Sequence, residues 1–164
     1  LGRQVAEQAL SVFSSQTDVV SPKIIIQSPA NDSAGDANFE LRGRAIATWL
    51  EVSHSSHDIA LITGPNHGLH HFAHWVDGWN DLRTAADICA YHGVNIETNP
   101  TRHGATRGQC LYFFDPAGNR NEVFTGGYMV DPDEPAVTWT ESEMGRAIFY
   151  YDGVVNQRFL TVHS

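Results

Sequence analysis

The spacing of apolar residues predicts one long helix near the middle of the chain. From Trp79 to His92 they recur every three to four positions, as on one face of an amphipathic helix. These residues are Leu82, Ala85, Ala86, Ile88, Cys89 and Ala90. Gly93 follows at a position where glycine commonly ends a helix. The pattern therefore predicts a helix over residues 79–92.

Short runs rich in β-branched and aromatic residues predict strands on both sides of this helix. The predicted strands cover residues 45–52, 57–63, 69–76, 94–97, 109–114 and 120–124. Asp115-Pro116-Ala117-Gly118 is a tight-turn sequence between the last two strands. Because strands precede and follow a single long helix, we predict an α+β fold.

The chain divides into three predicted parts. Residues 1–44 are rich in Ser, Asp, Asn, Pro and Gly around the apolar run Ile24–Ile26, so we expect a partial module start with a long insertion or loop and one short strand. Residues 45–136 are expected to form the central module. Residues 137–164 are expected to form a C-terminal tail packing on the active site. The tail pattern predicts a short helix near residues 141–146 and a strand near 147–151.

Composition narrows the class of protein. A length of 164 residues fits one domain, with 41% hydrophobic and 18% charged residues as in globular proteins. The formal net charge of -9 argues against a nucleic acid or an anionic membrane as partner, and no apolar run has the length of a membrane helix. Cys89 and Cys110 are too few for a disulfide framework. We read both as reduced and predict a cytoplasmic protein.

Residues that could bind a metal ion lie in two of the predicted strands. Nine histidines are many for this length, and imidazole is a common metal ligand. Along residues 69–76, strand alternation places His71 on one face and turns His70 to the other. In residues 120–124, Glu122 shares a face with Arg120 and Phe124, where a buried carboxylate needs a cation. That cation is either a nearby arginine or a metal ion. We expect histidines 54, 67, 74, 92 and 163 to be structural or exposed.

Several ordered motifs resemble the extradiol ring-cleaving dioxygenases, especially the catechol 2,3-dioxygenase branch. They are His-Asp-Ile-Ala at 57–60, His-His at 70–71, Pro-Thr-Arg-His-Gly at 100–104 and Tyr-Phe-Phe-Asp-Pro-Ala-Gly-Asn-Arg-Asn-Glu at 112–122. The tail segments Val137–Thr140, Gly145–Tyr150 and Arg158–Phe159 resemble the same branch. The resemblance implies βαβββ modules of the glyoxalase/extradiol dioxygenase type, with a curled mixed sheet around a metal, and it makes residues 45–136 the catalytic module.

Roles follow from the resemblance by matching position. His71 and Glu122 would be ligands of a ferrous ion, Fe(2+). His57 would be the acid/base residue beside the oxygen site. His103 and Tyr112 would hydrogen-bond the oxygens of the bound substrate. Two imidazoles and one carboxylate on one face of an octahedral ion leave its other positions open.

The implied reaction is extradiol, or meta, cleavage of catechol, or of an alkyl- or chloro-substituted catechol, by O2. The product would be 2-hydroxymuconic semialdehyde, as in aromatic degradation. The resemblance also implies a homo-oligomer. Two alternatives are a glyoxalase-like metal isomerase of the same fold and a non-catalytic small-molecule binding module.

One ligand of the implied set has no counterpart in the chain. The family takes its first histidine ligand from a strand upstream of the segment that matches Leu1, and no histidine precedes His54 here. We expect that ligand on an upstream part of the same protein, of which this sequence is then a piece. The alternative is a degenerate module that cannot hold iron tightly.

Overall fold

The protein is described by a computed structural model. It describes residues 25–26, 37–41, 44–50, 53–62, 68–129 and 138–161. The chain forms two compact units, of which the first comprises residues 1–63 and 129–142 and the second comprises residues 64–128 and 143–164. Each unit is described by itself. In these described parts, no helix has the length and apolar character needed to cross a bilayer.

The described residues of the first unit include several short antiparallel strands. Strands β2 (Ala37–Leu41), β3 (Arg44–Leu50) and β4 (Ile59–Ile62) form one sheet, and β1 (Ile25–Ile26) pairs with β9 (Thr138–Trp139). The predictions for residues 45–52 and 57–63 are confirmed by β3 and β4, and β1 is the short strand expected before residue 45. Strand β2 was not predicted, because the polar residues around it resemble a loop. The remainder of the predicted insertion lies outside the described residues.

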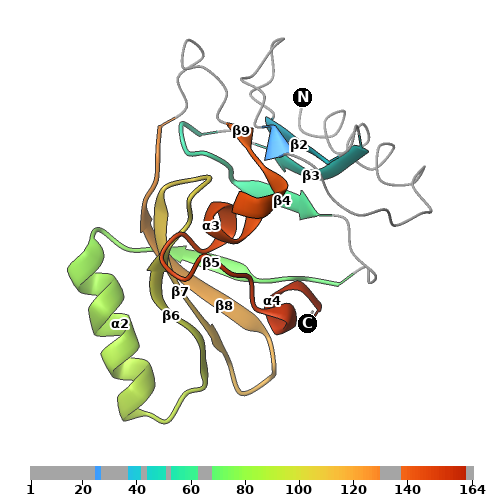
Figure 1. Cartoon of the computed structure of the whole chain (residues 1–164). Coiled ribbons are helices and arrows are strands. Elements are labelled where there is room, and N and C mark those ends of the chain that lie inside the picture. Colours follow the sequence, from blue (N-terminus) through green and yellow to red (C-terminus); the bar gives the residue numbers. More distant parts are fainter. Residues whose placement is uncertain are drawn as a thin grey trace. The chain divides into compact units, whose positions relative to one another are not determined.

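The second unit has the predicted βαβββ order. It runs β5 (Phe72–Trp75), α2 (Trp79–Tyr91), β6 (Ile96–Arg102), β7 (Gly108–Phe114) and β8 (Arg120–Gly126). In space the strand order is β5-β8-β7-β6, with β5 parallel to β8 and the other neighbours antiparallel (Figure 1). The sheet is therefore mixed and open, and the predicted α+β class is confirmed.

Helix α2 has clear sequence signals at both ends. The backbone N–H of Gly78 donates to the Asp81 carboxylate at 3.1 Å, which holds the first turn. Gly93 adopts a φ of 66°, the left-handed conformation that ends the helix. Leu82 and Cys89 are buried, and the helix lies along β6, β7 and β8 (Figure 1). Both cysteines, Cys89 and Cys110, are free and buried.

Strand β6 continues beyond the predicted end at residue 97, although it contains a proline. It extends through Pro100 to Arg102, with irregular pairing to β7 between Thr98 and Thr101. Proline cannot donate to a sheet ladder, but it is tolerated on an edge strand and at a bulge. Strand β6 is both an edge strand and irregular at this point. Sequence pattern alone would end the strand earlier.

The C-terminal tail is helical where a strand was predicted. After a 3-10 turn (η1, Glu141–Glu143) it forms α3 (Met144–Ile148) and α4 (Gln157–Thr161). The helix predicted near 141–146 is confirmed, but the strand predicted over 147–151 is wrong. The chain instead folds back at residues 149–153, and a Cβ on Gly145 would lie 2.0 Å from the Gly153 carbonyl oxygen. This close approach needs glycine at position 145. Ala147 and Phe149 are both buried, although neither lies in a strand.

The strand register brings a set of side chains to one face of the sheet. Glu122 pairs with Tyr112 on β7 and with Ala73 on β5, and Cys110 pairs with Phe124. Directly paired residues project to the same face. Phe149 and Phe159 of the tail pack on this face, in a buried cluster with Cys110 and Tyr112. The tail therefore covers part of the face that carries Glu122.

A buried ion pair fixes the tail to the sheet. Arg120 is 0% exposed, and its Nε and Nη2 donate to the Glu97 carboxylate at 2.6 and 2.9 Å. Nη1 donates to the carbonyl of His70, and Nη2 also to that of Arg158, each at 3.3 Å. One guanidinium thus binds β6, the segment before β5 and the first turn of α4. A bidentate, fully paired guanidinium of this kind gives geometric specificity.

Replacing Arg120 by Met should destabilise the fold strongly. The substitution leaves the Glu97 carboxylate, 1% exposed, without its bidentate partner. Breaking a buried pair costs about 3–5 kcal/mol. Arg83→Met is the matched control, because Arg83 and its partner Asp87 are 62% and 67% exposed. That change should cost about 0–1 kcal/mol. Urea unfolding measures both variants, and equal losses would contradict the role of the buried pair.

Candidate metal centre

His71 and Glu122 converge on the covered face of the sheet. The distance between His71 Nε2 and Glu122 Oε2 is 3.1 Å. Glu122 lies on β8, and His71 lies directly before β5, the strand parallel to it. The Glu122 side chain is 9% exposed and that of His71 is 22% exposed, so His71 is the more solvent-accessible member of the pair.

His103 and Tyr112 lie beside this pair. His103 Nε2 is 2.9 Å from the Tyr112 hydroxyl and 3.6 Å from Glu122 Oε1. Its Nδ1 donates to the Ile148 carbonyl at 2.5 Å, so the tail orients the ring. Tyr112 is 2% exposed. The two oxygens of Glu122 therefore face two different imidazoles, and the structure brings four of the five predicted site residues together.

The loop that presents His103 is held at both ends. The backbone N–H of His103 donates to the Gly108 carbonyl at 2.8 Å, and that of Ala105 donates to the Ala147 carbonyl at 2.9 Å. The first bond closes the β6–β7 turn and the second ties it to α3. His103 is thus fixed by two backbone contacts as well as by its ring.

Burial and neighbouring charge set the protonation of the cluster. Burial by itself raises the pKa of the Glu122 carboxyl, but His103 and His71 lower it to about 2. Burial by itself lowers the pKa of His103, whereas Cys110 and Glu122 beside the ring raise it well above its ordinary value. The pKa of Tyr112 is raised well above its ordinary value by burial first and by Glu122 second. Glu122 is therefore an anion and Tyr112 a neutral phenol at neutral pH.

Cys110 offers a third type of donor at the same place. One ligand atom each of His103, Cys110 and Glu122 lies within 4.8 Å of the others. The Cys110 side chain is 0% exposed, and burial raises the pKa of its thiol, although His103 partly opposes this. The sulfur therefore stays a protonated thiol, which is a poor ligand for a hard or borderline ion.

Glu122 does not rely on the neighbouring arginine for its charge balance. The sequence left open a salt bridge between Glu122 and a nearby arginine. In the structure Arg120 binds the Glu97 carboxylate in a bidentate contact, and His71 and His103 face Glu122. The two buried carboxylates of this face thus have different partners. Glu97 has a fixed cation of the protein, and Glu122 has two imidazoles.

His70 is the residue that the sequence pattern placed incorrectly. Its Nδ1 lies 2.6 Å from Nδ1 of His71, so strand alternation does not separate the two rings. Alternation fails here because both residues precede Phe72, where β5 begins. The other ring nitrogen, Nε2, lies 2.6 Å from the carbonyl oxygen of Phe159. His70 therefore links His71 to the tail.

His57 belongs to the other unit. Its ring stacks on Trp49 with centroids 4.5 Å apart, and Nδ1 lies 3.1 Å from the Ser56 hydroxyl. The side chains of Ser53 and Asp58 hydrogen-bond at 2.9 Å across the turn that carries it. The acid/base role of His57 stays a prediction.

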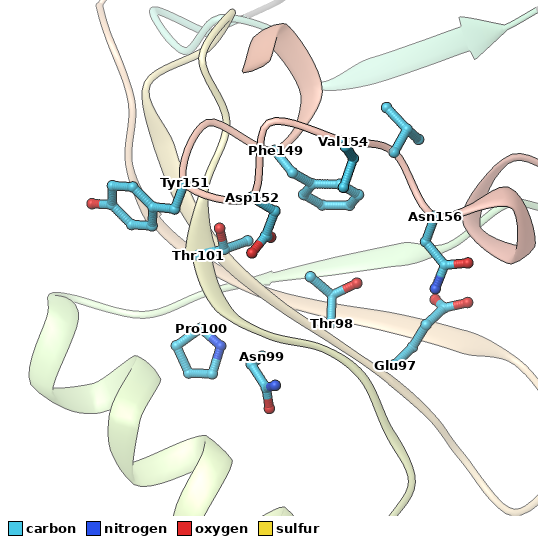
Figure 2. Close-up of a pocket in the computed structure, with 11 residues that line it drawn as sticks. Glu97, Thr98, Asn99, Pro100, Thr101, Phe149, Tyr151, Asp152, Val154 and Asn156 are labelled. Atoms are coloured by element: carbon cyan, nitrogen blue, oxygen red, sulfur yellow. The ribbon is translucent and has the colours of Figure 1, made fainter. Parts of the chain in front are cut away.

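The cavity in Figure 2 is separate from this cluster. It measures about 300 Å³ and lies between β6 and residues 149–156 of the tail. Glu97, Thr98 and Phe149 line it together with Asp152 and Asn156. His71, His103, Tyr112 and Glu122 are not among its lining residues. Phe149 lines the cavity and also stacks on the His103 ring, at a centroid distance of 5.8 Å.

Comparison with known proteins identifies the family. The model of the Glyoxalase/Bleomycin resistance protein/Dioxygenase superfamily matches residues 13–123. The chain belongs to this superfamily. It is 46% identical over 121 residues to metapyrocatechase, a catechol 2,3-dioxygenase, from Pseudomonas sp. (strain CF600). The predicted resemblance to that branch is confirmed.

Two further relatives carry dioxygenase names. Over 109 residues the chain is 38% identical to the manganese-dependent 2,3-dihydroxybiphenyl 1,2-dioxygenase of Geobacillus genomosp. 3, covering 63% of this chain and 35% of that protein. The crystal structure of the 2,3-dioxygenase LapB from Pseudomonas sp. KL28 matches with a TM-score of 0.54 and 34% identity, over 79% of this chain and 42% of that one. The match to metapyrocatechase covers 73% of this chain and 39% of that protein. The chain thus spans about two fifths of the length of these relatives.

Proposed function

We propose that this chain is the metal-binding part of an extradiol dioxygenase that cleaves the ring of catechol or a substituted catechol with O2. The observation that carries the proposal is the convergence of His71 and Glu122 at 3.1 Å, with His103 and Tyr112 directly beside them. The similarity to a metapyrocatechase supports the same reaction.

The donor spacing fits a divalent ion in octahedral coordination. Two donors bound at about 2.1 Å and at a right angle lie about 3.0 Å apart. His71 Nε2 and Glu122 Oε2 are separated by 3.1 Å. A buried carboxylate also needs a compensating cation, which such an ion supplies. We therefore assign His71 and Glu122 as two ligands. The third donor that the resemblance implies, from an upstream part of the same protein, stays an expectation.

The neighbouring residues suit the binding of a catechol. A redox-active ion held here supplies a Lewis acid for the phenolic oxygens and a redox path between the ring and O2. Tyr112, a neutral phenol, donates a hydrogen bond to a substrate oxygen, and His103 holds a proton on Nδ1 while Nε2 faces the site. His57 is proposed as the residue that moves a proton during ring opening. Both atoms of O2 enter the product as one ring bond beside the hydroxyls breaks, which gives the muconic semialdehyde.

We propose ferrous iron as the ion. Imidazole and carboxylate donors suit iron and manganese alike, and one relative is named as manganese-dependent. Catechol-type substrates and O2 fit the relatives' names.

A homo-oligomer follows from the resemblance alone, and a cytoplasmic location is supported by the two free cysteines.

Loading the purified protein with ferrous iron under argon, then adding catechol and air, tests the proposed reaction. The yellow semialdehyde should form, and a parallel sample loaded with manganous ion should react more slowly if iron is the native metal. Metal analysis of each sample gives its occupancy. Full iron occupancy without yellow colour would contradict the proposed dioxygenase activity. Catechol binding without turnover would favour a binding module instead.

Glu122→Gln should weaken iron binding by at least about 100-fold while the fold persists. The substitution keeps the shape of the side chain but removes the charge that a divalent ion needs. Asp77→Asn is the control, since it removes one carboxylate at an exposed position of the same unit. Retained iron is measured after dialysis against a weak chelator. Equal retention by the two variants would show that Glu122 is not a ligand.

His57→Phe should lower kcat about 100- to 10,000-fold, the usual effect of losing a general acid or base, with iron content unchanged. His54→Phe is the matched control, because His54 is an exposed histidine three positions earlier on the same turn. Steady-state kinetics at saturating catechol compare the two. A wild-type kcat in His57→Phe would remove the proposed proton-transfer role.

A further inference from the structure

Three short contacts connect the tail to His71 in a continuous path. The Phe159 carbonyl oxygen lies 2.6 Å from His70 Nε2, and His70 Nδ1 lies 2.6 Å from His71 Nδ1. His71 Nε2 then faces Glu122 at 3.1 Å. Each step joins one ring nitrogen to the next polar atom, so the proton positions along the path are coupled.

The direction of these hydrogen bonds is set at the tail. A carbonyl oxygen only accepts, so His70 Nε2 must carry a hydrogen and donate to Phe159. An ion bound by Nε2 of His71 leaves the hydrogen of that ring on Nδ1, and Nδ1 of His70, 2.6 Å away, is then its acceptor. In the metal-bound state the hydrogen between the two rings therefore belongs to His71 Nδ1. The lone pair of His71 Nε2 then lies on the side of Glu122.

The structure assigns His70 as a positioning residue that fixes the tautomer of His71 and aims its Nε2 lone pair at the metal. This inference rests on the proposed function and deepens it. A lone pair that faces a carboxylate oxygen at 3.1 Å is unfavourable unless a cation lies between them. Metal-binding histidines characteristically donate their other ring N–H to a neighbouring acceptor, which here is the imidazole of His70.

The protein holds this acceptor firmly in place. Arg120 donates to the backbone carbonyl of His70 and to that of Arg158, the residue before Phe159. The His70 ring also packs edge-on against the Phe159 ring, with centroids 4.7 Å apart. The buried Arg120–Glu97 pair therefore fixes both ends of the bond between His70 and the tail. Movement of α4 would break the contact between His70 and the Phe159 carbonyl, and the tautomer of His71 would no longer be fixed.

Long-range proton–nitrogen NMR spectra of the protein loaded with zinc, a diamagnetic ion, test the tautomers directly. In the wild type, His70 should carry its hydrogen on Nε2 and leave Nδ1 unprotonated, and the Nδ1 hydrogen of His71 should show the downfield shift of a strong hydrogen bond. In His70→Leu, which has neither acceptor nor donor, that downfield shift should be lost. A wild-type His70 protonated on Nδ1 would overturn the inference, and this result does not depend on any variant being folded.

Ferrous iron affinity, measured under argon against a competing chelator, is the second readout. His70→Leu should bind about 10- to 100-fold more weakly than wild type. His70→Asn should recover most of the loss, because its amide oxygen accepts from the His71 ring in place of Nδ1. His74→Leu, which removes an exposed histidine of the adjoining strand that contacts Asn121 at 3.3 Å, should bind as wild type does.

The outcomes separate this inference from the proposed function. Equal iron affinity in His70→Leu and His74→Leu, or an Asn variant no better than Leu, would overturn the positioning role of His70 while leaving the metal site intact. A wild-type protein that binds neither iron nor zinc would instead overturn the proposed function.

Discussion

The site is built around one buried carboxylate. Glu122 lies on β8, a strand with a neighbour on each side, and register places it beside Tyr112 and Ala73. A carboxylate in such a position is costly unless positive charge or hydrogen-bond donors surround it. The imidazoles of His71 and His103 face its two oxygens, and they approach from segments that the sequence separates by about thirty residues. The placement of these rings follows from the need to compensate Glu122.

The same face carries a second buried carboxylate, Glu97, whose charge is compensated in a different way. Glu97 is paired with Arg120 by a bidentate contact that is closed to solvent. That pair needs no further ion, and it ties the segments carrying His70 and the tail to the sheet. Glu122 instead faces the imidazoles of His71 and His103, and the side chain of His71 is 22% exposed. One buried acid therefore holds the scaffold together, and the other is available for chemistry.

The C-terminal tail is part of the site as well as its cover. Phe149 and Phe159 pack around Tyr112, while the carbonyls of Ile148 and Phe159 accept from His103 and His70. Backbone carbonyls are fixed acceptors, so the ring nitrogen that faces each of them carries a hydrogen. Two of the histidines at the site are thus oriented from the tail, although His70 lies just before β5 and His103 directly follows β6.

The sequence by itself determined the local elements and the types of residue at the site. Apolar spacing gave α2 its limits, the Asp-Pro-Ala-Gly turn joined β7 to β8, and strand alternation placed Glu122 on the face of Arg120. Motif order pointed to His71, Glu122, His103 and Tyr112, which the structure brings together. These signals are local, since periodicity and turn chemistry act over a few residues.

Only the tertiary structure decided the contacts between distant segments. The partner of Arg120 lies 23 positions away, and the acceptor of His70 lies 89 positions away. Alternation could not place His70, because it precedes the strand. The apolar residues at 147–151 resemble a strand in sequence, but the close approach of Gly145 to Gly153 belongs to a chain reversal there. Hydrogen-bond partners and buried ion pairs depend on which elements pack together, and that information is not contained in any short stretch of the chain.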